Sequence, residues 1–405
     1  MDRRKFIAGV GTLTVGLAGC TGDSGEGTTT GSGGGSTSTG TGASTTAGGA
    51  ETTAGGDETT DSAETTEEGS SGSYSVSMPP VGEVSFDGVP ETWVANNGSW
   101  ADMGVALGVE PPKAVWMTSR YHTRYYDEIP GVSVDKSGMQ SLYDGGVSKE
   151  RFYELDADVH VVDPNFLMNR FKGWEQADVD EVREEIAPFF GNSIFSRGYE
   201  WHEDYEYFTL YEAFEKLSQL FRREDRYEQF AAIHDEMQSR LSEVVPSKKS
   251  ERPSVAVFWA SGDQPEEFLP YLVDKGTSFK QWRDLRVNDA LANTDVRNFH
   301  SSRAAVDYET LLEIDPEVLL LRGHESQTAR EFQNTVVQYL KDHETASALT
   351  AVQNGDVYRG GPLYQGPITN LVLTQRAASQ VYSDALGDTK LYDAEKVSSV
   401  VDGSN

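Results

Sequence analysis

Short apolar segments alternate with stretches of helical character along the chain from residue 84 onward. The apolar segments predict buried strands at residues 91–96, 114–117, 159–162, 255–259, 318–321 and 357–358. The intervening stretches predict helices at residues 99–108, 149–155, 267–274, 308–314 and 369–382. Because strands that alternate with helices are typical of parallel sheets with crossover connections, we expect an α/β fold.

Residues 207–245 differ, because their apolar positions keep a helical spacing over a much longer stretch. These positions are Leu210, Phe214, Leu217, Leu220, Phe221, Phe230, Ile233, Met237 and Leu241. The pattern predicts a long helix up to Pro246, either continuous or broken near Glu224-Asp225. It divides the folded part into an N-terminal lobe (residues 73–206), a bridging helix (207–246) and a C-terminal lobe (247–405).

Two segments on opposite sides of this predicted helix share one layout. Residues 147–164 (VSKERFYELDADVHVVDP) and residues 306–323 (VDYETLLEIDPEVLLLRG) each contain a helix, an acidic turn and a buried strand. The repeat is too divergent for a solenoid, in which many units stack. It predicts two lobes of related architecture.

The N-terminus carries a targeting pattern. Arg3-Arg4 precede a short apolar stretch, which resembles a twin-arginine export signal, and residues 17–20 (LAGC) resemble a lipobox. We therefore expect a signal peptide at residues 1–19 and lipid attachment at Cys20, the only cysteine. Residues 21–72 contain only Thr, Gly, Ser, Ala, Asp and Glu, so residues 20–72 are expected to form a disordered tether, either glycosylated or plain.

Charge and motifs exclude several classes of function. The formal net charge is −31, and phosphate binding needs a basic face, so nucleic acid is not an expected partner. One cysteine excludes an intrachain disulfide framework. No nucleophile elbow, phosphate loop or dinucleotide fingerprint occurs, so we expect no enzyme. The tether holds only nine of the acids, and the acidic folded part leads to the hypothesis of a salt-adapted protein.

Ligands in open α/β sheets bind beyond the carboxyl ends of the strands, so the loops there form the candidate site. These loops are rich in Arg, Tyr and Trp. Arg forks bind anionic oxygens, and aromatic faces pack on bulky ligands. The candidate ligand-binding residues are Asn97, Trp100, Arg120, Tyr121, Arg124, Tyr125, Asn165, Trp259, Arg303, Arg322 and Tyr364. The alternative is that each arginine pairs with a nearby acid.

The histidines give no separate signal for a metal. No His-x-x-x-His pair and no His-rich acidic loop occurs, so we expect no metal site and no cofactor. Tyr121, His122 and Tyr125 are eligible as axial ligands of haem, and nothing in the sequence selects one of them.

The repeated phrase of helix, Leu-x-x-Asp and buried strand resembles class III substrate-binding proteins of ABC importers. Residues 129–138 (IPGVSVDKSG) and 349–362 (LTAVQNGDVYRGGP) resemble segments of that family in the same order, and the likeness covers roughly residues 84–387. The resemblance implies two Rossmann-like lobes bridged by one long helix, with the ligand in the cleft between them.

The resemblance also implies a function. It is that of a monomeric, lipid-anchored protein on the extracytoplasmic face, which captures a ferric siderophore-like ligand and delivers it to a permease with its ATPase subunit. Haem, cobalamin or a bare metal ion are alternative ligands. Glu150 and Glu309, at matching places in the two repeats, are implied to dock to the permease. A lipid-anchored surface enzyme or interaction protein is the alternative from another class.

Overall fold

The computed structural model describes residues 72–404, except residues 172, 198, 200, 203 and 303 and the side chains of residues 300 and 301. The predicted signal peptide, Cys20 and the tether up to residue 71 lie outside the described residues, as does Arg303. Ser71–Asn405 form one compact unit. None of its described helices is long and apolar enough to cross a membrane.

The N-terminal lobe is built on a parallel four-stranded sheet with the order β5-β4-β3-β6. Its strands are β3 (Trp93–Ala95), β4 (Ala114–Val115), β5 (Gln140–Ser141) and β6 (Val159–Val161). The helices are α1 (Gly98–Ala106), α2 (Lys149–Leu155), α3 (Pro164–Arg170) and α4 (Gln176–Glu185), with the 3-10 helices η1 (Thr118–Arg120) and η2 (Thr123–Glu128). The predicted α/β class of this lobe is confirmed.

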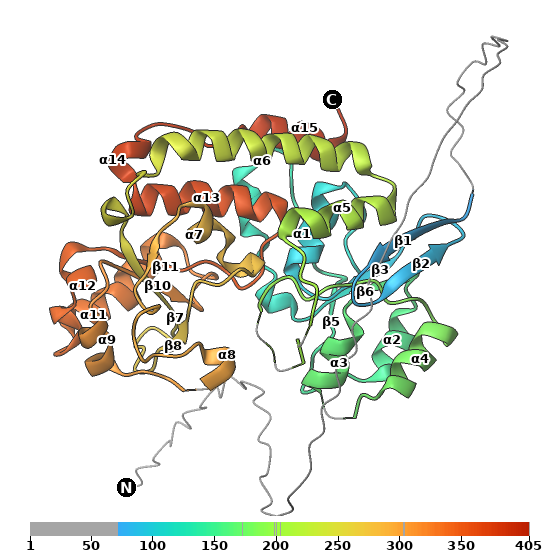
Figure 1. The fold of residues 1–405 in the computed structure, drawn as a ribbon, viewed down its shortest axis with the longest axis horizontal. Helices are drawn as coiled ribbons and strands as arrows, with labels where there is room; N and C mark the ends of the chain where they lie inside the picture. The colour runs from blue at the N-terminus through green and yellow to red at the C-terminus, as the bar shows by residue number, and fades with distance from the viewer. Residues whose placement is uncertain are drawn as a thin grey trace, which may run out of the picture. The chain divides into compact units, whose positions relative to one another are not determined.

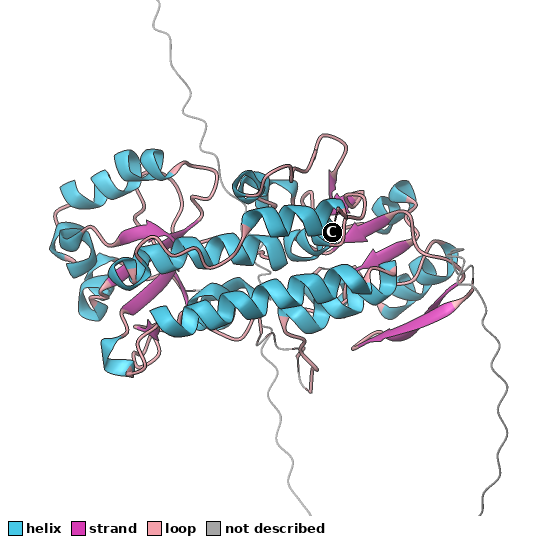
Figure 2. Ribbon diagram, turned by 90° about the horizontal axis from the view of Figure 1, so that it is seen from above, coloured by secondary structure: helices cyan, strands magenta, loops and turns pink. Residues whose placement is uncertain are grey.

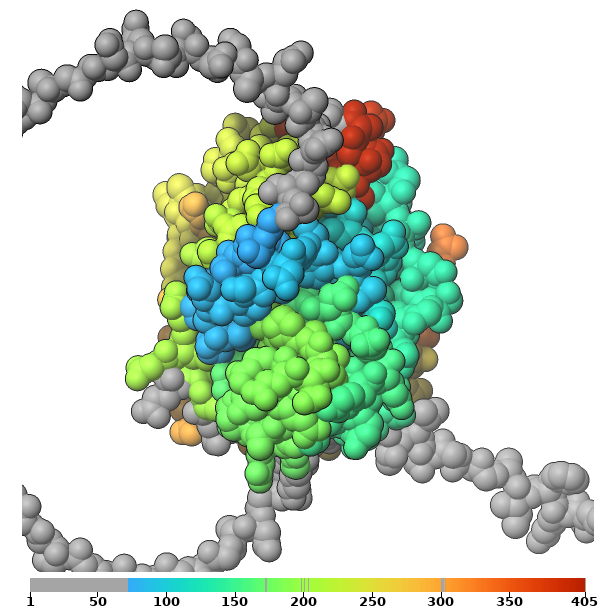
Figure 3. All heavy atoms as spheres, turned by 90° about the vertical axis from the view of Figure 1, so that its right-hand side faces the viewer, coloured from blue at the N-terminus to red at the C-terminus, as the bar shows by residue number. Residues whose placement is uncertain are grey.

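An antiparallel hairpin of β1 (Tyr74–Met78) and β2 (Gly82–Phe86) precedes this sheet, and the sequence analysis did not predict it. Tyr74 packs on Phe86, with 5.5 Å between ring centroids, and its hydroxyl donates to the carbonyl oxygen of Leu220. Figure 3 shows this hairpin, in blue, on the surface of the N-terminal lobe.

The C-terminal lobe has a mixed five-stranded sheet with the order β11-β10-β7-β8, and β9 also pairs with β7. Its strands are β7 (Ser254–Trp259), β8 (Leu269–Tyr271), β9 (Asn288–Asp289), β10 (Val318–Arg322) and β11 (Val357–Arg359). All pairs are parallel except β7 with β8. The prediction of a helix at residues 267–274 was wrong. Pro270 cannot continue a helix, and an edge strand such as β8 tolerates it.

Helices surround this second sheet (Figure 1). They are α7 (Lys280–Asp284), α8 (Phe299–Ser302), α9 (Tyr308–Ile314), α10 (Ala329–Phe332), α11 (Gln338–Asp342), α12 (Thr350–Asn354), α13 (Pro367–Val381) and α14 (Ser383–Leu386). The last helix, α15 (Ala394–Asp402), packs instead against α6 and α1. Short 3-10 or π turns are η3 (Lys249–Glu251), η4 (Thr277–Phe279), η5 (Gln333–Val337) and η6 (Ala346–Ala348).

The predicted bridging segment contains two helices, α5 (Leu210–Phe221) and α6 (Glu224–Val244). Arg222 ends α5 in the left-handed conformation with φ +53°, which turns the chain back. The break therefore falls just before Glu224-Asp225. Helix α5 packs against α6, and α6 also contacts α13 and α15. Figure 1 shows α6 extending over both lobes, with α13 beside it over the C-terminal lobe. Figure 2 shows this helix layer from above, with strands toward its two opposite ends.

The repeat predicted from the sequence is confirmed in detail. Helices α2 and α9 end at Asp156 and Asp315, which have φ values of 44° and 40°. Two residues later, the carboxylate of Asp158 accepts the backbone N–H of Thr92 at 2.7 Å. The carboxylate of Glu317 accepts the backbone N–H of Ser254 at 2.6 Å. In each lobe, an acid thus joins the start of one strand to the neighbouring strand.

A buried carboxylate fixes α13 against α1. Asp102 accepts the backbone N–H groups of Ile368 and Thr369 at 3.0 and 3.2 Å, which satisfies donors at the start of α13. Burial raises the pKa of Asp102 to about 6. Gly366 is required here, because a Cβ atom would lie 2.4 Å from Oδ2 of Asp102. Helix α13 follows the C-terminal sheet in the chain, and this contact anchors its start to α1 of the N-terminal lobe.

Candidate functional site

The first group of predicted residues meets where strands of both lobes end. Arg120 closes η1 beyond β4, and its guanidinium lies 5.6 Å from the ring centroid of Trp259 at the end of β7. Arg120 also forms a hydrogen bond with Tyr364, which follows β11. Burial raises the pKa of Tyr364, and Arg120 and Arg170 oppose this rise. Three of the predicted residues, Arg120, Trp259 and Tyr364, are thus brought together from the two lobes.

Beside them lies a set of rings from the N-terminal lobe, which we name the aromatic wall. Its members are Trp116, Tyr143, Phe166, Phe171, Phe195, Tyr199 and Trp201. The ring of Trp116 stacks on Tyr143 at 5.1 Å, and Tyr199 stacks on Trp201 at 4.3 Å. Phe195 meets Tyr364 edge-on at 5.5 Å. Trp116, Tyr143 and Phe166 follow β4, β5 and β6, so the wall lies at the carboxyl ends of the sheet, where ligands bind.

The chain after Phe195 extends this wall with further polar rings. The hydroxyl of Tyr205 donates to Oδ2 of Asp163 at 2.6 Å. His202 stacks on Tyr205 at 4.2 Å, and the guanidinium of Arg197 lies 4.5 Å from the ring centroid of Tyr207. Burial lowers the pKa of His202 to about 4, so this histidine is neutral at neutral pH. The sequence analysis took no candidate ligand-binding residue from this segment, although its run of aromatic residues is a visible signal.

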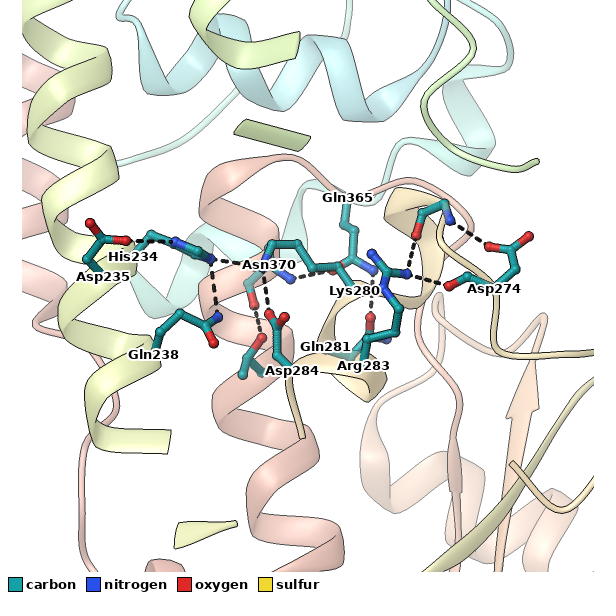
Figure 4. Close-up of polar contacts among 12 residues, drawn as sticks. His234, Asp235, Gln238, Asp274, Lys280, Gln281, Arg283, Asp284, Gln365 and Asn370 are labelled. Carbon is teal, nitrogen blue, oxygen red and sulfur yellow. Dashed lines mark hydrogen bonds and ion pairs between the residues drawn. The ribbon is translucent and has the colours of Figure 1, made fainter. Parts of the chain in front are cut away.

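Amide side chains fix the loop that carries Tyr364. Gln365 is buried and donates from Nε2 to Oε1 of Gln281 at 2.6 Å, while its own Oε1 accepts from Asn370 at 3.0 Å (Figure 4). The backbone N–H of Gln365 donates to Oγ of Ser99 at 3.1 Å. The position of Tyr364 is therefore set by α7, α13 and α1 together.

The same view shows how the C-terminal lobe is held to α6. Lys280 of α7 lies 2.8 Å from Nε2 of His234 and 2.7 Å from Oδ2 of Asp284 (Figure 4). Burial, with the charge of Lys280, lowers the pKa of His234 to about 4. A neutral imidazole accepts a hydrogen bond from the Lys280 ammonium group, and this buried hydrogen bond joins α6 to α7.

Four predicted residues lie in the interior. Asn97 caps α1 by accepting the N–H of Ser99 at 2.9 Å, and Trp100 is fully buried. The hydroxyl of Tyr121 lies 2.7 Å from that of Tyr126. Arg322 is fully buried, and burial lowers its pKa to about 10. A ligand contact for these residues stays a prediction.

Asn165 is half-buried in the first turn of α3, next to Phe166 of the aromatic wall. Its backbone N–H donates to Oδ1 of Asp163 at 2.9 Å, which caps the helix. Asn165 therefore lies at the same edge of the N-terminal sheet as the wall, and its ligand role stays a prediction.

Arg124 and Tyr125 join a different cluster, centred on Glu325. The Tyr125 hydroxyl donates to Oε2 of Glu325, and the guanidinium of Arg376 pairs with the same oxygen at 3.4 Å. The backbone N–H of Gly361 donates to Oε1 of Glu325 at 2.9 Å. Burial opposes ionisation of Glu325, but the charge of Arg376, the hydrogen bond from Tyr125 and the charge of Arg359 hold its pKa below the ordinary value. This cluster ties η2 to the C-terminal lobe.

Glu150 and Glu309 occupy corresponding, exposed positions in the first turns of α2 and α9. Backbone and Ser148 hydrogen bonds lower the pKa of Glu150. Both side chains are therefore available to a partner on the two lobes. Among the described residues, no group of three or more His, Cys, Asp or Glu side chains is arranged to hold a metal ion.

The comparisons agree with this two-lobe arrangement. The sequence profile described as "periplasmic binding protein" matches residues 94–363, two thirds of the chain. A comparison with curated proteins found no match. A periplasmic binding protein from Veillonella parvula is 14% identical with a TM-score of 0.53, covering 78% of this chain and 99% of its own.

Two further solved structures are similar. The iron uptake ABC transporter substrate-binding protein PiuA from Streptococcus pneumoniae is 15% identical with a TM-score of 0.52, covering 76% of this chain and 97% of its own. The catecholate-siderophore binding protein VctP from Vibrio cholerae is 15% identical with a TM-score of 0.50, covering 75% and 98%. At such identities, these likenesses show the shared fold.

Proposed function

Because the chain belongs to the periplasmic binding protein family, whose members bind solutes outside the cytoplasm for ABC importers, we propose that its solute is an anionic iron chelate of the siderophore type. One observation carries the proposal: Arg120, Trp259 and Tyr364 from the two lobes meet beside the aromatic wall. Guanidinium forks bind hydroxamate or catecholate oxygens. The half-buried rings of the wall, Tyr143, Phe171, Tyr199 and Trp201, offer flat apolar surface to a bulky ligand.

The similar proteins support the same ligand class. PiuA is named for iron uptake and VctP for catecholate-siderophore binding. Haem, cobalamin and a bare metal ion are the competing ligands. Haem has an eligible axial ligand in this region, since the Tyr199 ring lies beside the site at the end of the aromatic wall.

The ligand test is a titration of the full-length protein with ferric hydroxamates, ferric catecholates, haemin and cobalamin, followed by tryptophan fluorescence. Trp201 and Trp259 lie at the site, so a bound iron chelate quenches their emission. The Arg120→Gln variant is expected to weaken binding of the ferric chelate at least tenfold, because it removes a charged hydrogen bond donor.

Arg183→Gln is the matched control, because Arg183 is exposed on α4 and pairs only with neighbouring acids. It is expected to bind the chelate as the parent does. Haemin or cobalamin binding in place of every ferric chelate would refute the ligand class. Chemical turnover of a bound compound would favour the alternative of a surface enzyme.

Delivery is proposed to use Glu150 and Glu309 as contacts for arginines of a permease, which works with its ATPase subunit. Reversing both charges to Lys is expected to leave ligand affinity unchanged and to abolish uptake in cells. Glu154→Lys with Glu313→Lys is the control, because these exposed acids lie one turn further along the same helices. Normal uptake by the Glu150/Glu309 variant would reject this docking.

The protein is further proposed to be a monomer anchored through lipid on Cys20, after cleavage of a twin-arginine signal peptide. Mass spectrometry of the membrane-extracted protein tests this directly. The expected product begins at Cys20 and carries acyl chains, and a soluble product that retains residues 1–19 would contradict it.

A further inference from the structure

A second cavity lies apart from the proposed chelate site. Its volume is about 590 Å³, and it is enclosed by η2, the end of β11, α13 and residues 386–392. Arg124, Arg359 and Arg376 line it, together with the polar side chains of Gln375 and Ser379. None of Arg120, Trp259, Tyr364 and the aromatic wall is among its lining residues.

Two of these arginines converge on one atom. Arg124 of η2 and Arg359 of β11 both donate from Nη1 to the carbonyl oxygen of Gln327. Arg124 comes from the N-terminal lobe, whereas Arg359 comes from the C-terminal lobe. Two like charges are therefore held within hydrogen bond distance of a single oxygen, an arrangement that repels itself unless an anion offsets it.

The buried acid at this place does not offset all of the charge. Glu325 is 2% exposed, and its two oxygens are occupied by Gly361, Tyr125 and Arg376. The other acids that line the cavity, Asp127, Glu128 and Asp388, are exposed at its rim, where water screens them. Three guanidinium groups thus face one buried carboxylate.

Among the described residues, Arg124 and Arg359 form no ion pair, although their charges help to lower the pKa values of Glu331 and Glu325. Within the described part of the chain, neither arginine has a carboxylate oxygen within 4.0 Å. This is unexpected in a chain with 65 acidic residues against 34 basic ones. Each guanidinium has five N–H donors in a fixed fork, and the bonds to the backbone use Nη1 alone.

We infer that this cavity binds a small inorganic oxyanion, phosphate or sulfate, between Arg124 and Arg359. The tetrahedral oxygens match the guanidinium forks. Nε2 of Gln375 donates one hydrogen to the Thr389 carbonyl and keeps its second amide hydrogen as a further donor. Because the two arginines belong to different lobes, the bound anion bridges them and favours this arrangement of the lobes. The proposed oxyanion site shares no lining residue with the chelate site, so the inference does not depend on which chelate the protein binds.

Isothermal titration calorimetry of the full-length protein tests the inference, with phosphate and, separately, sulfate as titrants at constant NaCl concentration. Saturable binding of one anion per chain is expected. Arg359→Gln and Arg124→Gln are each expected to weaken it at least tenfold, whereas Arg359→Lys, which keeps the charge and loses the fork, weakens it less. Arg183→Gln on α4 is the control and binds as the parent does.

Melting temperatures of the variants show whether each one is folded before it is titrated. Absence of saturable binding by the parent would overturn the inference. Undiminished binding by both folded Gln variants would also overturn it. The chelate titration is separate, so a failure of either proposal leaves the other standing.

Discussion

Glu325→Gln tests how strongly the buried carboxylate joins the two lobes. Glutamine keeps one oxygen for the N–H of Gly361, but it places an NH2 group against the Tyr125 hydroxyl and leaves Arg376 without its counter-charge. Breaking a buried pair on one side costs about 3–5 kcal/mol. Since the Arg376 side chain is 23% exposed, water offsets part of this loss, and we expect about 3 kcal/mol.

Differential scanning calorimetry measures this loss. Unfolding entropy is about 2.1 cal/mol/K per residue, or roughly 0.7 kcal/mol/K for about 330 folded residues, so a loss of about 3 kcal/mol lowers Tm by about 4 °C. Glu344→Gln is the control, because Glu344 is an exposed acid with no carboxylate contact among the described residues, and it is expected to melt as the parent does. Equal melting temperatures for the two variants would refute the reasoning.

The pH dependence of folding stability tests the same Glu325 interaction independently. Because its cationic partners hold the pKa of Glu325 below the unfolded value of about 4.5, its ionised form stabilises the fold above that value. The stability is lost as pH falls through the lowered pKa. The difference between parent and Glu325→Gln is therefore expected to be constant near neutral pH and to shrink on acidification below about pH 4.5. A difference that grows on acidification would contradict this.

The remaining predictions concern the repeat, the net charge and α13. Asp156→Gly is expected to stabilise the protein by about 0.5–1 kcal/mol, because glycine adopts φ +44° without strain; Asp315→Gly gains less, since it loses two hydrogen bonds to Thr350. Urea unfolding compares the two. The same assay in rising KCl is expected to show rising stability, because salt screens acidic repulsion. Gly366→Ala is expected to lower Tm, because its Cβ meets Asp102, and an unchanged Tm would contradict the close approach.

Local patterns predicted regular elements well and irregular ones poorly. Helices α2 and α9 agree with the prediction because polar residues precede each apolar helical face and an acid ends it. Strand β8 was missed because three residues with a central proline carry no periodicity. The break near Glu224-Asp225 was one of two alternatives in the prediction, and the sequence did not decide between them because a left-handed arginine such as Arg222 has no signature of its own, unlike glycine.

The sequence predicted which loops form the candidate site, but not which of their side chains face a ligand. Loops after strands do gather at one edge, which brought Arg120, Trp259 and Tyr364 together. Which of their side chains turn inward depends on tertiary partners, such as the Ser278 carbonyl for Arg322 or Tyr126 for Tyr121. Sequence position alone contains no information about those partners.

A crystal structure of the protein grown with the ferric chelate that binds best, with the anomalous signal of iron recorded, tests the central claim most directly. The account predicts one iron peak between the lobes, with chelate oxygens within hydrogen bond distance of Arg120 and the chelate in contact with Trp259, Tyr364 and the aromatic wall. An iron peak elsewhere on the protein, with this site filled only by solvent, would contradict it.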